Sequence, residues 1–194
     1  MTFVAAKPMT LEEYFAYADS AEYGSERTYE LVNGELVEMS PESEQNRRIA
    51  MFLVAYFLQL GISFQQLTLK TEMVVSGARA TTRYPDLMVL SEDLVEALSG
   101  AKRSTVMLDM PPPLLVVEVV SPRQEARDYR YKRSEYAARG IAEYWIVDAI
   151  AQKVTVLEWV EGLYEEQVFE GDSVILSPLF GTLRLTAAQV LQPA

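Results

Sequence analysis

Apolar positions follow helical spacing in several stretches of the chain. They recur at steps of three and four residues from 42 to 60, which predicts a helix that ends before Gly61. The pattern Thr10-Leu11-Glu12-Glu13 has the form of a capping box and predicts a shorter helix over residues 11–19. Further helices are expected from Ser91 to 98, from 123 or 126 to 139 with Gly140 as the stop, and over 186–191.

Other stretches alternate or are wholly apolar, as strands do. The pair Asn33-Gly34 separates two alternating runs, 29–32 and 35–39, and predicts a tight hairpin because both residues tolerate positive φ. The remaining strands are expected over residues 62–66, 69–75, 87–90, 114–120, 143–148, 153–160 and 163–169, with two shorter runs after them.

This order of elements predicts a single α/β domain with a central mixed sheet flanked by helices. With 194 residues, 49% of them hydrophobic and 23% charged, the chain is long enough to bury a core. No stretch has the composition of a linker. The core is expected over about residues 11–158, followed by a meander and a short helix over 159–194.

An acidic residue inside an apolar strand is the strongest chemical signal. Glu118 lies in Leu114-Leu115-Val116-Val117-Glu118-Val119-Val120, and an unpaired carboxylate there would cost several kcal/mol. A second acid, Asp86, begins the apolar run after Arg83-Tyr84-Pro85, and Lys132 lies on the basic helix downstream of Glu118. Two acids and a lysine around two strands predict a site for a hard metal ion and a phosphate.

The absence of cysteine and histidine narrows the chemistry further. It excludes cysteine nucleophiles, Cys/His zinc sites and a histidine general base. Carboxylate and carbonyl ligands favour Mg²⁺ or Mn²⁺, so Asp86, Glu118 and the carbonyl of Val119 are the candidate metal ligands. Lys132 would then activate water or stabilise negative charge in the transition state.

The net charge of −11 is unevenly distributed. Residues 45–140 carry 13 basic and 10 acidic side chains, for a net charge of +3, whereas residues 1–44 and 141–194 carry −8 and −6. The candidate site therefore lies in the basic middle of an acidic chain. Acidic flanks that merely aid solubility explain the same distribution.

Several short motifs, in this order, resemble the Uma-type putative endonuclease family of the PD-(D/E)XK, or restriction-endonuclease-like, superfamily. The resemblance covers about residues 11–158. The matching stretches are Tyr29 to Leu36, Arg83-Tyr84-Pro85-Asp86, Glu118-Val119-Val120-Ser121-Pro122, and Asp128, Lys132, Tyr136, Gly140 and Glu143-Tyr144-Trp145.

The resemblance implies a restriction-endonuclease-like α/β fold in which Asp86 is the PD acid and Glu118 the (D/E) acid. The superfamily's usual lysine position is Val120 here, and Lys132 is the candidate substitute. Glu30 matches an early family glutamate and is a candidate third acid. Asn46 lies near a position where relatives often carry histidine.

Each assignment has an ordinary structural alternative. Asp86 could close a local turn, Glu118 could pair with Arg83 or Arg130, and Glu30 could be a surface residue of the hairpin. Asp128 and Lys132 are four residues apart and could form a surface ion pair. The basic run around Arg123 and Arg130 could be a solvated helix face rather than a track along a phosphate backbone.

The hypothesis favoured by these observations is a Mg²⁺- or Mn²⁺-dependent DNA endonuclease, with Arg83, Arg123 and Arg130 at the nucleic acid. A homodimer is expected because cutting both strands commonly uses two sites related by a two-fold axis. A non-cleaving binding or assembly module and a hydrolase of small phosphorylated molecules are the alternatives. The first residues lack the pattern of a signal peptide, and the longest apolar run is too short to cross a bilayer, so a cytoplasmic location without a membrane partner is expected.

Overall fold

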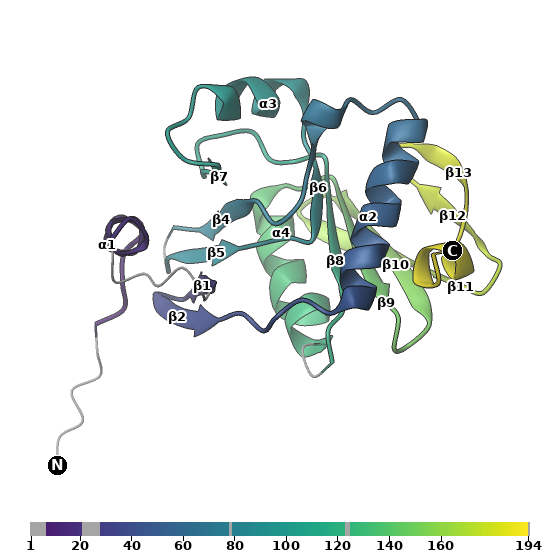
Figure 1. Ribbon diagram of the computed structural model, residues 1–194, viewed down its shortest axis with the longest axis horizontal. Coiled ribbons are helices and arrows are strands. Elements are labelled where there is room, and N and C mark those ends of the chain that lie inside the picture. Colours follow the sequence, from purple (N-terminus) through teal and green to yellow (C-terminus); the bar gives the residue numbers. More distant parts are fainter. Residues whose placement is uncertain (1–6, 21–27, 78, 123–124, 194) are drawn as a thin grey trace, which may run out of the picture.

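A computed structural model describes residues 7–20, 28–77, 79–122 and 125–193. Its centre is a six-stranded mixed sheet in the order β11-β10-β9-β8-β6-β3 (Figure 1). Strands β8 and β9 are parallel, and the other neighbouring pairs are antiparallel. The bounds are β3 (Leu67–Thr68), β6 (Leu87–Val89), β8 (Leu115–Val119), β9 (Glu143–Asp148), β10 (Lys153–Val160) and β11 (Leu163–Glu170). The predicted α/β class with a central mixed sheet is confirmed.

Helices cover both faces of this sheet, and Figure 1 shows α2 and α4 on opposite sides of β6 and β8. One core cluster lies beneath α2 (Glu44–Gln59) and α5 (Ala187–Leu191). The other lies beneath α4 (Arg133–Arg139) and α3 (Glu92–Ser99). Among the described residues, no helix combines the length and apolar character that crossing a bilayer requires.

The two faces of β8 explain where Glu118 points. Leu115, Val117 and Val119 contribute to the core under α2, whereas Val116 and Val120 contribute to the core under α4. Because side chains alternate along a strand, Glu118 shares the face of Val116 and Val120. The carboxylate is therefore directed toward the helix that carries Lys132.

Smaller strand groups extend the domain. A hairpin of β1 (Tyr29–Val32) and β2 (Glu35–Glu38) turns at Asn33 and Gly34, with φ of 54° and 85°, as predicted. The predicted capping box starts α1 (Leu11–Ala18). The other groups are the sheet β5-β4-β7, formed by β5 (Thr81–Arg83), β4 (Glu72–Ser76) and β7 (Thr105–Val106), and the pair β12 (Val174–Ser177) and β13 (Gly181–Thr186).

Two predicted strands were wrong in detail. Residues 62–66 contain the 3₁₀ turn η1 (Phe64–Gln66), which the Ser63 hydroxyl caps, and only the two-residue β3 follows. The predicted strand over 69–75 is interrupted by a bend, so that β4 begins at Glu72. Strands β5 and β7 were not predicted because three- and two-residue pairings leave no period in the sequence.

The predicted helix after Glu118 is present but not uniform. Its first part, η2 (Arg127–Lys132), is a π-helix, and α4 continues it to Gly140, which ends it with a φ of 74°. A π-helical turn is wider than an α-helical one and is frequent at functional sites. Asp128 and Lys132 both lie in this turn and are buried.

A buried ionic network joins the β1–β2 hairpin to the rest of the domain. The Arg83 guanidinium on β5 donates to Glu30 on β1 at 2.8 Å and to both oxygens of Glu135 on α4 at 2.7 Å. Arg127 also forms an ion pair with Glu30. Burial alone would raise the pKa of Glu30, but the charges of Lys132, Arg127 and Arg83 outweigh it and lower this pKa.

We expect Glu30→Gln to destabilise the protein by roughly 3–5 kcal/mol at pH 7, because it removes one partner of a buried ion pair. The depressed pKa of Glu30 stabilises the fold in full above the ordinary value of 4.5, and this stabilisation is lost as the pH falls through the folded-state pKa. The difference between wild type and variant should therefore shrink below pH 4.5. Urea unfolding across this range measures it, with the exposed Glu35→Gln as control. A pH-independent difference would contradict this role of Glu30.

Candidate active site

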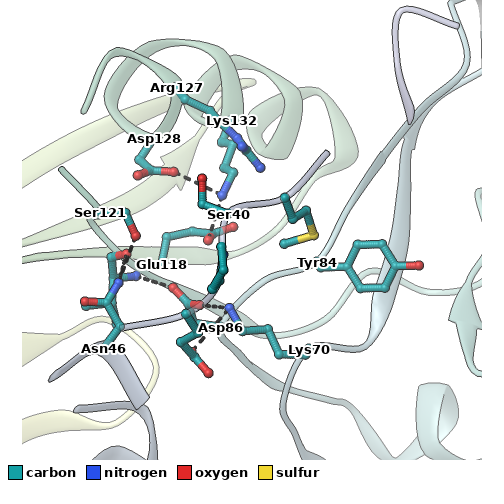
Figure 2. A pocket seen from close by; sticks show the side chains of 14 residues that line it. Ser40, Asn46, Lys70, Tyr84, Asp86, Glu118, Ser121, Arg127, Asp128 and Lys132 are labelled. Carbon is teal, nitrogen blue, oxygen red and sulfur yellow. Dashed lines mark hydrogen bonds and ion pairs between the residues drawn. The ribbon is translucent and has the colours of Figure 1, made fainter. Parts of the chain in front are cut away.

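Asp86 and Glu118 lie at the same end of two paired strands. Asp86 immediately precedes β6, and the antiparallel register pairs Leu87 with Val117. Asp86 Oδ2 accepts a hydrogen bond of 2.6 Å from the amide of Val119, the residue after Glu118. Both carboxylates are buried and line one cavity (Figure 2). Asp86 thus bonds across the sheet, not within a local turn.

Glu118 is held by two side chains of the following helix. Lys132 Nζ lies 2.7 Å from Oε2, and the Tyr136 hydroxyl donates to Oε1 at 2.5 Å. The alternative partners Arg83 and Arg130 do not pair with it: Arg83 binds Glu30 and Glu135, and Arg130 is exposed, with its guanidinium 6.0 Å from the Tyr131 ring centroid.

Asp128 completes this cluster. Lys132 Nζ lies 3.0 Å from Asp128 Oδ1, so one ammonium bridges two carboxylates. The pair is buried, unlike the surface pair that its four-residue spacing alone would suggest. The π-helical turn places both residues on the side of the helix that faces Glu118.

The electrostatics of the cluster follow from burial and from the excess of carboxylates around Lys132. Burial raises the pKa of Glu118 to about 7, with Asp86 and Asp128 adding to the rise and Lys132 opposing it. Burial would lower the pKa of Lys132, but the three acids Glu118, Asp128 and Glu30 raise it, so Lys132 stays charged. Burial and the neighbouring Glu118 also keep the Tyr136 hydroxyl protonated by raising its pKa.

A second lysine, Lys70, contacts the other acid. Its ammonium forms an ion pair with Asp86 Oδ1 and lies 3.4 Å from Glu42 Oε1 (Figure 2). Burial opposes its charge, but Asp86, Glu42 and Glu118 raise the pKa of Lys70 above its ordinary value. Each of the two candidate metal-binding acids therefore carries an ammonium partner.

Asn46, near the start of α2, also lines the cavity. Its amide nitrogen donates to the carbonyl of Val119 at 3.1 Å and to Ser121 Oγ at 3.0 Å. Its Oδ1 accepts from Ser43, the residue that caps α2. The carbonyl that was predicted as a metal ligand thus already accepts a hydrogen bond from an amide.

The remaining predicted residues are dispersed. Glu30 is buried, not on the hairpin surface, and is bound to Arg83 and Arg127. The Arg83 guanidinium is enclosed between two carboxylates, an arrangement that holds the hairpin and does not present the charge at the surface. Arg130 is exposed on η2, and Arg123 lies outside the described residues.

The cavity itself is small, at about 50 Å³, and strongly charged. Four carboxylates and three cations line it: Glu42, Asp86, Glu118, Asp128, Lys70, Arg127 and Lys132. Within the described parts of the chain, no three acids form a ready-made metal cluster. Mg²⁺ commonly keeps several waters and takes only one or two carboxylates, a demand that Asp86 and Glu118 can meet.

Sequence reasoning missed two of these contacts. Lys70 lies in an irregular connection between β3 and β4, where no period or motif identifies a site residue. Tyr136 was noted only as a family position, and its hydrogen bond to Glu118 required the helix to be placed against β8. A tyrosine four residues after Lys132 on the same helix was the available signal.

Comparison with known proteins identifies the family of this chain. A family model described as "Uma2: Putative restriction endonuclease" matches residues 11–188. The crystal structure of a putative nuclease belonging to DUF820 from Anabaena variabilis has a TM-score of 0.74 and 18% sequence identity, covering 95% of this chain and 98% of that chain. No curated protein sequence matches the chain. The family match, which spans most of the chain, shows that this protein belongs to the Uma2 family of restriction-endonuclease-like proteins.

Proposed function

We propose that this protein is an endonuclease that hydrolyses DNA phosphodiester bonds with Mg²⁺ or Mn²⁺. The observation that carries the proposal is the pair Asp86 and Glu118, brought to one buried cavity by neighbouring strands of a nuclease-family fold. Strands hold the two carboxylates more rigidly than loops would, as a catalytic site requires.

A divalent cation would supply, when bound, the positive charge that polarises the phosphodiester and activates water. Asp86 and Glu118 would hold it, with the Val119 carbonyl as a further ligand. The chain already orients these donors: the Val119 amide fixes Asp86, and Lys132 and Tyr136 fix Glu118. In this arrangement Lys132 opposes the rise in the pKa of Glu118 that burial causes, and it neutralises charge at the site.

The proposal that the substrate is DNA is supported by the net positive charge of residues 45–140. Arg130 is exposed on η2, close in sequence to Lys132, and is suited to a contact with a DNA backbone. Arg123 would extend that contact along the same segment. Cleavage of both strands would engage two copies of the chain, as a homodimer, each with one site.

A binding module without cleavage is the second candidate. The observation that favours it is that ammonium groups already neutralise both acids, Lys70 at Asp86 and Lys132 at Glu118. Under this candidate the two acids serve the fold alone. Mn²⁺ would then leave the melting temperature unchanged, whereas a cation that binds only the folded state raises it.

We expect Asp86→Asn and Glu118→Gln each to lower the rate of Mg²⁺-dependent plasmid nicking by about a hundredfold or more, because each removes a charge that acts in the transition state. Both substitutions keep the side-chain volume, so the melting temperature reports on folding separately. Glu96→Gln, on the exposed side of α3, is the control and should nick at the wild-type rate. Wild-type nicking by either site variant would refute the assignment.

We expect Tyr136→Phe to weaken Mn²⁺ binding by about tenfold, because a residue that orients a metal ligand commonly contributes 10- to 100-fold to affinity. The substitution removes the 2.5 Å hydrogen bond to Glu118 and keeps the ring. Tyr164→Phe loses a buried hydrogen bond to the Ile141 carbonyl instead and should not affect Mn²⁺. Calorimetric titration of both variants measures the difference, and equal affinities would show that Tyr136 only supports the fold.

A further inference from the structure

Lys70 differs from Lys132 in its access to solvent. The side chain of Lys132 is 5% exposed and is enclosed by Glu118 and Asp128. That of Lys70 is 38% exposed, with its ammonium on Asp86. A buried lysine that bridges two acids is poorly placed to reach a substrate, whereas a partly exposed one can move at little cost because its stem is flexible.

Lys70 also lies between two cavities. It lines the small inner one of about 50 Å³ together with both candidate acids. It lines a second hollow of about 500 Å³ as well, and Glu42 and Tyr84 are shared by both. The inner cavity has room for only a few water molecules, whereas the outer one has the size of ordinary ligand pockets. Six residues line both cavities, and Lys70 is the cation among them, so it is the positive charge that a phosphate meets where the outer hollow adjoins Asp86.

The backbone at Lys70 has an unfavourable conformation that places its side chain beside Asp86. Its φ is 51°, a left-handed value that is unfavourable for a residue with a side chain. The other described non-glycine residues with positive φ, Asn33, Gln152 and Glu161, lie in turns between consecutive antiparallel strands. Lys70 instead connects strands of two different sheets.

The Lys70 amide donates to the carbonyl of Pro85 at 3.1 Å, directly before Asp86. This hydrogen bond fixes the strained residue beside the acid, so that its side chain is aimed at Asp86 (Figure 2). Strain at a residue that the surrounding structure holds in place is a feature of functional sites.

We propose that Lys70 is the substrate-facing lysine of this site. In the free protein its ammonium neutralises Asp86, and when the substrate binds it passes to a phosphate oxygen. This inference rests on the proposed endonuclease function. It gives Lys132 a positioning role at Glu118 and assigns the contact with the reacting phosphate to Lys70.

The inference predicts opposite effects of one substitution on two measurements. Lys70→Met frees Asp86 from its ammonium and should tighten Mn²⁺ binding in the absence of DNA by about fivefold, the value of a partly exposed ion pair. The same variant lacks a cation at the phosphate and should nick plasmid about a hundredfold more slowly at saturating Mn²⁺. A purely structural role would not raise affinity while lowering the rate.

Two control variants test whether the positive charge of Lys70 causes both effects. Lys70→Arg keeps a cation at the same position, so its Mn²⁺ affinity should stay near that of the wild type. Lys102→Met removes an exposed lysine outside the site and should alter neither measurement. Calorimetric titration with Mn²⁺ and single-turnover plasmid nicking are made on the full chain, with circular dichroism to establish that each variant is folded.

The outcomes separate this inference from the proposed function. If the wild type binds Mn²⁺ and nicks plasmid while Lys70→Met binds no more tightly or nicks at the wild-type rate, Lys70 is not the substrate-facing lysine and the endonuclease proposal stands. If the wild type neither binds Mn²⁺ nor nicks plasmid, the proposed function and this role of Lys70 are both overturned.

Discussion

Lys132 places a positive charge beside a sheet face on which Val116 and Val120 pack against the apolar side of α4. That charge makes it possible for Glu118 to lie in an apolar strand, because an isolated carboxylate there would carry a penalty of several kcal/mol. The π-helical turn that precedes α4 aims Lys132 and Asp128 at the same acid. The buried Lys132 ammonium thus joins strand β8 to the helix that follows it, at the site itself.

The same principle, a buried acid matched by a nearby cation, recurs around the cavity. Glu30 is matched by Arg83 and Arg127, and Asp86 by Lys70. These pairs differ in what surrounds them. Glu30 and Arg83 are almost fully buried and, with Arg127 and Glu135, join four elements of the fold, whereas the Lys70 pair borders a hollow of about 500 Å³.

The sequence predicted most of the fold because its signals are local. Helix α2, the Asn33-Gly34 hairpin and strands β8 to β11 follow from periodicity and turn residues. It also led to Asp86 and Glu118, since a carboxylate in an apolar strand needs a partner. The partners themselves depend on packing between distant segments: Lys70 meets Asp86, and Asn46 meets the Val119 carbonyl 73 residues away. The bend at Lys70 depends on a hydrogen bond to the Pro85 carbonyl, just before β6, and the 3₁₀ turn after Ser63 follows a local capping box of Ser63 and Gln66 that leaves no period in the apolar residues.

The central claim is that Asp86 and Glu118 form a site for a divalent cation. It is tested most directly by titrating the purified wild-type protein and Asp86→Asn with Mn²⁺ in a calorimeter, with and without a DNA oligonucleotide. The account predicts saturable binding to the wild type that is lost in the variant. Absence of wild-type binding in both conditions, or equal binding by the variant, would contradict it.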